Sequence, residues 1–145
     1  MTQLCFDFDR IPSEPVPAPA GSRPTDRQLR GARGYHEGLA AEHRVAQDYE
    51  RRGFPIARRR WRGKGGEIDL IARDGAGLVF IEVKKSRSFD RAIERLTPRQ
   101  MRRLQAAAEE FLGTQPRGSR TEVRFDVVLL NRWGDMRVIE NALFY

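Results

Sequence analysis

Asp69, Glu82 and Lys84 combine residue types and a spacing that suit metal-dependent chemistry. Residues 67–73 and 78–85 have the composition of β-strands, and the Asp- and Gly-containing segment between them is typical of a turn. We therefore expect an antiparallel hairpin in which Asp69 lies directly opposite Glu82. Like charges in opposed positions on one face destabilise a hairpin, so this pair favours a bound cation.

The same register places Arg73 opposite Leu78 and Glu67 opposite Lys84. The other face of the hairpin is wholly apolar and consists of Ile68, Leu70, Ala72, Val79, Ile81 and Val83. The next opposed pair on the face of the carboxylates, Ile71 and Phe80, is apolar as well. Both faces are therefore expected to be at least partly buried, which places the two carboxylates where water is scarce.

Mg²⁺ or Mn²⁺ suits such a pair, because hard divalent cations are held by one or two carboxylates together with waters and substrate phosphate oxygens. Lys84 lies two residues after Glu82 and is therefore expected on the same face. Its ammonium could orient or help to deprotonate an attacking water, which would suit phosphodiester hydrolysis. The alternative is a lysine-neutralised acidic cluster that binds nothing, because motifs this short recur by chance.

The helix predicted over residues 36–52 has one unusual position. Leu39, Ala46 and Tyr49 lie along one apolar face, and Glu42 interrupts that face. A carboxylate in an apolar stripe costs free energy unless a partner compensates it. The simplest interpretation is a boundary residue whose carboxylate reaches an arginine.

A basic segment follows this helix. Residues 56–61 are expected to form an edge strand, since the preceding Pro55 is tolerated at a strand start. Five of the seven residues from Arg58 to Lys64 are basic, and Trp61 lies among them. Two interpretations are open: a charged edge that prevents aggregation, or a patch that follows nucleic-acid phosphates and offers a ring for stacking.

Thr97 and Pro98 predict the start of a second helix, whose apolar face continues to Leu112. Gln100 lies at its N-terminal end, on the inward side. Four arginines make this helix start basic, namely Arg95, Arg99, Arg102 and Arg103. Such a helix start could bind a phosphate, although a solvated charged face is the usual explanation.

Residues 124–130 and 137–139 are expected to be two further strands. Side chains two residues apart on a strand point to the same face. Arg124 and Asp126 are therefore expected to brace each other rather than to act on a substrate.

One folded domain is expected from the 145 residues, because domains usually have about 100 to 200. Five of the eight prolines fall between Pro12 and Pro24, in a segment that cannot hold a helix or a central strand. We expect residues 1–34 to be a disordered arm and residues 35–145 to be the domain. That domain carries 22 basic against 16 acidic residues, and the 24 Arg and 3 Lys of the chain favour bidentate phosphate binding.

Several classes of protein are excluded by composition. No segment approaches the about 20 apolar residues of a transmembrane helix, and the acidic N-terminus differs from a signal peptide, so we expect a cytoplasmic protein without a membrane partner. The only cysteine, Cys5, excludes an internal disulfide and a Cys-based zinc site. His36 and His43 are too few for a zinc ligand set. A metal would have to be bound by oxygen atoms.

The chain contains three motifs in a recognisable order, namely Gly65-Gly66-Glu67-Ile68-Asp69-Leu70-Ile71, Phe80-Ile81-Glu82-Val83-Lys84 and Arg124-Phe125-Asp126-Val127-Val128. Over residues 36–143 it resembles the YraN-type bacterial family, UPF0102. That family is placed with the PD-(D/E)XK nuclease superfamily and is similar to archaeal Holliday-junction resolvases. The resemblance implies an α/β, restriction-endonuclease-like fold with a mixed β-sheet flanked by helices.

The resemblance also implies roles for individual residues. Asp69, Glu82 and Lys84 take the positions of the catalytic residues. Glu42 takes the position of a family glutamate in the first helix, which would make it a metal-site residue together with the two hairpin carboxylates. Gln100 stands where the family commonly has a lysine, which weakens a second cationic contact at the reacting phosphate, although a neighbouring arginine could replace it.

We therefore expect a Mg²⁺- or Mn²⁺-dependent DNA endonuclease that acts on branched or otherwise structured DNA. The residues expected to bind nucleic acid are Arg58, Arg59, Arg60, Arg62, Lys64, Arg99, Gln100 and Arg103. The alternative is a nucleic-acid-binding module with the same fold that cuts nothing. A protein-interaction adaptor is a third class, but it leaves the paired carboxylates unexplained. Junction resolvases act as dimers, so a homodimer is a further hypothesis.

Residues 3–8, Gln3-Leu4-Cys5-Phe6-Asp7-Phe8, resemble the short peptide by which bacterial DNA-processing proteins bind the replication sliding clamp. Its three large apolar side chains would lie in an apolar groove of the clamp while the arm acts as a tether. Chance apolar residues at a terminus are the alternative. The sliding clamp is therefore a hypothetical partner, to be tested with a peptide of residues 1–10.

Overall fold

A computed structural model describes residues 24–142 of the chain and arranges them as a five-stranded sheet flanked by helices. The elements are α1 (Asp26–Arg51), β1 (Ile56–Arg62), β2 (Glu67–Asp74), β3 (Gly77–Lys85), α2 (Phe89–Glu94), α3 (Pro98–Leu112), the 3₁₀ helix η1 (Gly118–Arg120), β4 (Val123–Leu130) and β5 (Met136–Ile139). The strands follow each other in the sheet in chain order. β3 and β4 are parallel and the other neighbours are antiparallel, which confirms the predicted mixed sheet of an α/β fold.

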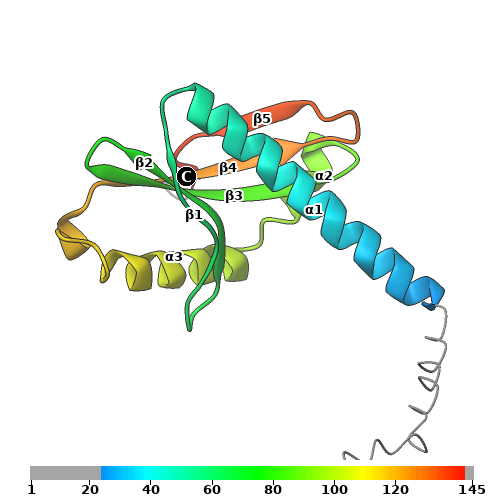
Figure 1. The fold of residues 1–145 in the computed structure, drawn as a ribbon, viewed down its shortest axis with the longest axis horizontal. Coiled ribbons are helices and arrows are strands. Elements are labelled where there is room, and N and C mark those ends of the chain that lie inside the picture. Colours follow the sequence, from blue (N-terminus) through cyan, green and yellow to red (C-terminus); the bar gives the residue numbers. More distant parts are fainter. Residues whose placement is uncertain (1–23, 143–145) are drawn as a thin grey trace, which may run out of the picture.

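Helices cover both faces of the sheet, with α1 on one face and α2 and α3 on the other (Figure 1). Alternate residues of β4 show this arrangement: Val128 and Leu130 belong to the core under α1, whereas Val127 and Leu129 pack with α2. The parallel strands β3 and β4 need a crossover connection, which α2 and α3 supply. No helix within residues 24–142 is long and apolar enough to span a membrane.

α1 begins ten residues before the predicted helix start. Thr25 and Gln28 form a capping box, in which the Thr25 side chain accepts from the Gln28 backbone N–H (3.3 Å) and the Gln28 side chain accepts from the Thr25 backbone N–H (2.8 Å). Residues 26–34, which we had assigned to the arm, are thus helical. Buried positions of α1 begin only at Ala41, and its N-terminal part extends beyond the sheet (Figure 1). Residues 1–23 of the arm, including the clamp-like residues 3–8, lie outside the described residues.

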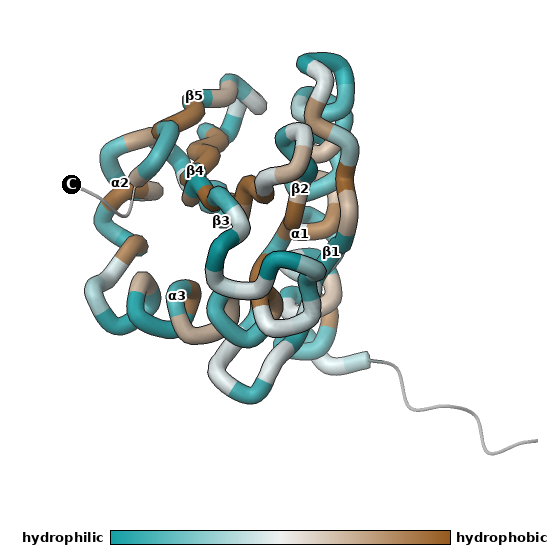
Figure 2. The backbone as a smooth tube through the Cα atoms, turned by 90° about the vertical axis from the view of Figure 1, so that its left-hand side faces the viewer, coloured by the Kyte–Doolittle hydropathy of each residue, from teal (hydrophilic) through white to brown (hydrophobic). Residues whose placement is uncertain are grey.

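The apolar residues gather on the strands and on the inner sides of the helices, while the loops are mostly polar (Figure 2). One predicted face is wrong. Ile68 was expected on the same side as Leu70 and Ala72, but it packs with Ile71 in the core under α3. The alternation breaks at the intervening Asp69, where the pairing of β2 with β3 ends.

Several other predicted elements are confirmed. β1 is an edge strand, as the proline before it suggested, and β4 and β5 match the two C-terminal strands. α3 extends from Pro98 to Leu112 and is capped by Gly113. The short helix α2 was not predicted, because six residues are too few for a clear apolar period.

The N-cap of α3 gives a first testable prediction, because Thr97 Oγ1 accepts from the backbone N–H of Gln100 (3.2 Å). Thr97→Ala should lower the free energy of unfolding by about 1 kcal/mol, since it leaves that N–H without its side-chain acceptor. Urea denaturation of both proteins measures the difference. Thr97→Ser keeps the acceptor and should stay close to wild type; an equal loss in the serine variant would contradict a capping role.

Candidate functional site

The candidate site lies where β2 and β3 separate. The two strands pair from Asp74↔Gly77 to Leu70↔Ile81, in the predicted register. Beyond that point β2 pairs only with β1, and β3 continues along β4. The predicted backbone pairs Asp69–Glu82 and Glu67–Lys84 therefore do not form. Instead, Asp69 Oδ2 accepts from the backbone N–H of Val83 (2.9 Å), which replaces the ladder hydrogen bond.

Asp69 is in an environment that disfavours its ionised form. Burial is the largest cause and the negative charge of Glu82 the second, and together they raise the pKa of Asp69 to about 8. The hydrogen bond from Val83 acts in the opposite direction, and Glu42 adds a smaller repulsion. Two carboxylates have thus been brought together in a poorly hydrated place, as the sequence suggested.

Glu82 is buried and is held by two donors. Lys84 Nζ lies 2.9 Å from Glu82 Oε1, which confirms that the two side chains share a face. Gln100 Nε2 donates to the same oxygen, also at 2.9 Å. Gln100 reaches the strand from the first turn of α3, so the helix N-terminus and the sheet meet at this carboxylate.

Glu42 is paired with an arginine. Arg60 Nε and Nη2 donate to its two carboxylate oxygens at 2.8 and 3.1 Å, a bidentate ion pair that is mostly shielded from solvent. The pair raises the pKa of Arg60. The simple interpretation of Glu42 as a boundary residue with an arginine partner is thus realised, and the partner comes from the neighbouring edge strand β1.

These groups border one cavity of about 440 Å³. Its lining consists of Tyr35, Glu42, Arg60, Arg62, Gly66, Glu67, Asp69, Glu82, Gln100, Arg103 and Leu104. Seven residues predicted for the site or for nucleic-acid binding are among them. Lys84 is outside the lining but contacts Glu82. The structure does not bring Arg58, Arg59, Lys64 or Arg99 into this cavity.

The carboxylates do not form a crowded metal cluster. Among the described residues 24–142, no group of three or more His, Cys, Asp or Glu side chains could hold a metal ion. Asp69 and Glu82 alone still provide hard oxygen donors beside a cavity, and their mutual repulsion would be relieved by a cation. This pair fits a divalent cation completed by waters and substrate oxygens. Glu42 fits as a further ligand only if Arg60 releases it.

Four cavity residues were not predicted as site residues, and two of them, Tyr35 and Glu67, make contacts with the predicted arginines. Tyr35 lies with its ring 5.0 Å from the Arg60 guanidinium, and Glu67 pairs with Arg62 (3.2 Å). The position of Glu67 two residues before Asp69 was an available signal. Tyr35 had none, because the predicted helix began after it.

Trp61, by contrast, is not an open stacking surface. It is half-buried, and its ring packs edge to face against Phe111 with 5.3 Å between the ring centroids. The ring extends the core under α3. The basic segment around it therefore has no exposed aromatic ring for nucleic acid.

The fold and the site together define an α/β protein of restriction-endonuclease-like architecture, with a carboxylate and lysine cluster where two central strands separate. The chain belongs to the UPF0102 family, whose family model, described as "Uncharacterised protein family UPF0102", matches residues 41–130. The matched segment contains Glu42, Asp69, Glu82, Lys84 and Gln100.

Relatives from several bacteria carry the same family name. A UPF0102 protein of Ruegeria pomeroyi is 57% identical over 113 residues, which are 78% of this chain and 92% of the relative. One from Cereibacter sphaeroides strain KD131 is 54% identical over 114 residues, covering 79% and 97%. One from Dinoroseobacter shibae is 48% identical over 115 residues, covering 79% and 86%. The family predicted from the three sequence motifs is thus confirmed.

Proposed function

We propose that the protein is a metal-dependent endonuclease that hydrolyses phosphodiester bonds in branched or otherwise structured DNA. The observation that supports this most is the placement of Asp69, Glu82 and Lys84 together at the point of strand separation. The order Asp, then Glu-x-Lys on the next strand, is that of the PD-(D/E)XK nucleases, which the sequence resembles.

Each side chain has a role that its contacts allow. Asp69 and Glu82 would hold Mg²⁺ or Mn²⁺, and the bound ion would supply Lewis-acid activation of the phosphodiester and of a water. Lys84, with Nζ beside Glu82, can orient the attacking water and neutralise negative charge that develops on the phosphate. Gln100 fixes the Glu82 carboxylate from the side of α3.

Arginines around the cavity supply the means to hold the DNA backbone. Arg62 and Arg103 line it from β1 and from α3, so cations approach the carboxylates from two elements. A guanidinium can donate two parallel hydrogen bonds to one phosphate. The excess of basic residues in the domain would add a longer-range attraction for a polyanion.

A non-catalytic nucleic-acid-binding module is the second candidate, and one observation favours it. Glu42 and Glu82 are already paired with Arg60 and Lys84, so the acidic residues have protein cations as partners. In that case the arginines would bind DNA and the carboxylates would only stabilise the fold. Cleavage separates the two candidates.

The test is incubation of the purified full chain with linear duplex, flapped and four-way DNA in Mg²⁺ or Mn²⁺. We expect cleavage of at least one branched substrate and none in EDTA. Absence of cleavage of all three substrates in both metals would overturn the nuclease proposal. Retained, salt-sensitive DNA binding in that case would support the binding module instead.

A further inference from the structure

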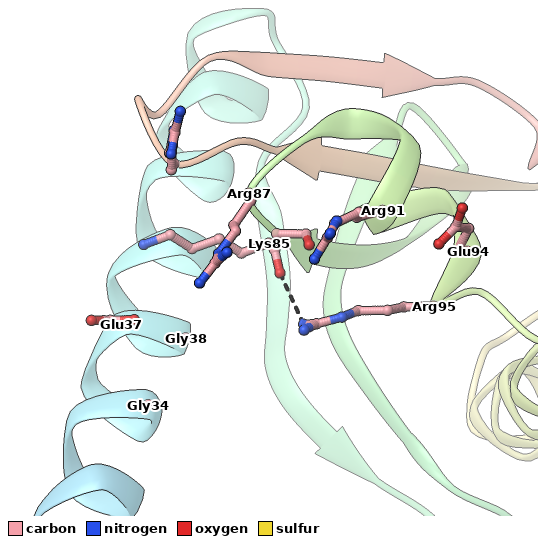
Figure 3. A pocket seen from close by; sticks show the side chains of 10 residues that line it. Gly34, Glu37, Gly38, Lys85, Arg87, Arg91, Glu94 and Arg95 are labelled. Atoms are coloured by element: carbon pink, nitrogen blue, oxygen red, sulfur yellow. Dashed lines mark hydrogen bonds between the residues drawn. The ribbon is translucent and has the colours of Figure 1, made fainter.

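A second cavity, larger than the first, lies between α1, α2 and the C-terminal end of β3. It has a volume of about 1170 Å³ and is lined by Gly34, Glu37, Gly38, Lys85, Ser86, Arg87, Arg91, Glu94, Arg95 and Arg132. Five of these residues are cationic and two are acidic. Figure 3 shows Lys85, Arg87, Arg91 and Arg95 reaching into the space between α2 and α1, while Glu37 and Glu94 lie at opposite margins.

The cations of this cavity have no carboxylate partners among the described residues. Arg95 donates to the backbone carbonyl of Lys85 (3.1 Å), which ties α2 to the end of β3 (Figure 3). All five side chains are solvent-exposed. Several converging cations without carboxylate partners favour an anionic ligand with more than one phosphate.

An exposed tryptophan lies beside these cations. Trp133 is 70% exposed, the largest exposed fraction among the large hydrophobic residues that the structure describes. It lies in the turn between β4 and β5, and the guanidinium of Arg132 covers its ring at 4.3 Å from the centroid. The face of the indole that Arg132 leaves open is flat, and a nucleobase can stack on it.

The turn that carries Trp133 is held firmly by a buried residue. Asn131 Oδ1 accepts from the backbone N–H groups of Trp133 (3.0 Å) and Asp135 (2.9 Å), and Asn131 Nδ2 donates to the Asp135 carboxylate (2.9 Å). Gly134 adopts a φ of +80°, which closes the turn. The backbone at Trp133 is therefore held in place, whereas the ring itself is not buried.

Trp133 and the basic cavity border one continuous surface. A smaller hollow of about 280 Å³ is lined by Trp133 and shares Lys85 and Arg132 with the basic cavity. This surface adjoins the candidate site along α1, because Gly38 of the basic cavity lies beside the Arg60 guanidinium of the candidate site. α1 contributes to both cavities, with Gly38 in the basic one and Glu42 in the other.

We propose that the basic cavity and Trp133 bind an unpaired strand of nucleic acid next to the candidate site. The cations would hold successive phosphates, and the indole would stack on a base. In an intact duplex the base faces are covered by their neighbours, so a stacking ring selects single-stranded segments such as those at a flap or a branch. The inference rests on the proposed function, whose substrate it narrows to DNA with an unpaired strand beside the cut.

Binding of fluorescein-labelled oligo(dT) and of a blunt duplex of equal length, followed by anisotropy in EDTA, tests the proposal. Trp133→Ala should weaken binding of oligo(dT) about tenfold and leave duplex binding unchanged, because one stacking contact is lost. The double variant Arg87→Ala/Arg91→Ala should lower the salt dependence of oligo(dT) binding by about 0.7 in log–log slope for each lost phosphate contact. Arg117→Ala/Arg120→Ala, at exposed positions of a separate hollow around η1, is the matched control.

Intrinsic fluorescence gives a second measurement, because the chain has only two tryptophans. Oligo(dT) should quench the emission of wild type and of Trp61→Phe, but not that of Trp133→Phe. Equal quenching in Trp133→Phe, or an unchanged affinity of Trp133→Ala for oligo(dT), would overturn the inference. These experiments need no metal and no cleavage. If the protein binds oligo(dT) through Trp133 but never cuts DNA, the nuclease proposal is wrong and the inference about Trp133 stands. If the protein cuts DNA but the Trp133 variants bind oligo(dT) like wild type, the nuclease proposal stands and the inference about Trp133 is wrong.

Discussion

The Asp69→Asn variant should lose metal-dependent DNA cleavage by about a thousandfold, which corresponds to roughly 4 kcal/mol of transition-state stabilisation. Asparagine has nearly the same shape, and its carbonyl oxygen can still accept from Val83 N–H. It lacks the charge that would hold the cation with Glu82. Single-turnover cleavage of the preferred branched substrate measures the effect.

Asp74→Asn is the matched control for this variant. Asp74 is an exposed acid at the other end of β2, so its replacement removes one negative charge from the same strand without touching the cavity. We expect it to cut like wild type. If Asp69→Asn also cuts at the wild-type rate, Asp69 does not take part in the reaction, and a contaminating nuclease becomes the explanation of any cleavage.

The Asp69→Asn substitution should also change how the free energy of unfolding depends on pH. The pKa of Asp69 rises from an ordinary 3.8 to about 8 on folding, so the unfolded chain ionises first as the pH increases. Between these two values the folded state binds more protons than the unfolded state, and stability falls as the pH rises. Metal-free Asp69→Asn should lack this fall, and its advantage over wild type should grow from pH 4.5 to pH 8.5. Urea denaturation of both proteins and of Asp74→Asn checks the trend.

Added Mg²⁺ or Mn²⁺ should make the wild-type protein more stable than Asp69→Asn. A cation that binds only the folded wild type stabilises it by about 2.7 kcal/mol at a concentration one hundred times the Kd. Thermal melting at pH 8 should therefore show a metal-dependent rise for wild type and Asp74→Asn, and no rise for Asp69→Asn. Equal stabilisation of all three proteins would place the metal elsewhere.

The hairpin could be predicted from sequence because its information is local. Turn residues and strand composition set the register, and the register brought Asp69 and Glu82 to the same region. Lys84 followed from the two-residue repeat of a strand. The divergence of β2 from β3 was not predictable in this way, because it depends on the pairing of β2 with β1 and of β3 with β4.

Contacts between distant segments were the part that the sequence did not reveal. Glu42 was recognised as misplaced, but its partner Arg60 lies on another element, and composition offered many arginines to choose from. The start of α1 was missed for a different reason. Thr25-x-x-Gln28 is a capping-box pattern, but it directly follows a proline-rich stretch whose composition predicts no helix.

A buried network at the far end of α1 fixes how that helix lies on the sheet. Asp126 on β4 accepts from Tyr49 Oη of α1 (2.7 Å) and from two nitrogens of Arg124 (both 2.9 Å). The backbone N–H of Asn141 donates to it as well (3.2 Å). Burial and the hydrogen bond to Asp126 raise the pKa of Tyr49, so the hydroxyl keeps its proton and remains a donor. The predicted mutual bracing of Arg124 and Asp126 is confirmed, and it includes the helix that carries Glu42.

Asp126→Ala should therefore destabilise the protein by about 3 to 5 kcal/mol, because it leaves a mostly buried guanidinium and a buried hydroxyl without their acceptor. Tyr49→Phe removes only one hydrogen bond and should lower the free energy of unfolding by about 1 to 2 kcal/mol. This variant can therefore still be measured if the alanine variant does not fold. Combined with Asp126→Ala, the Tyr49 change should cost almost nothing more, since its partner is already absent. Glu122→Ala, an exposed acid just before β4, should stay close to wild type in the same urea titrations. Additive losses in the double variant would show that Tyr49 and Asp126 act independently, and the network would then not be what holds α1 against β4.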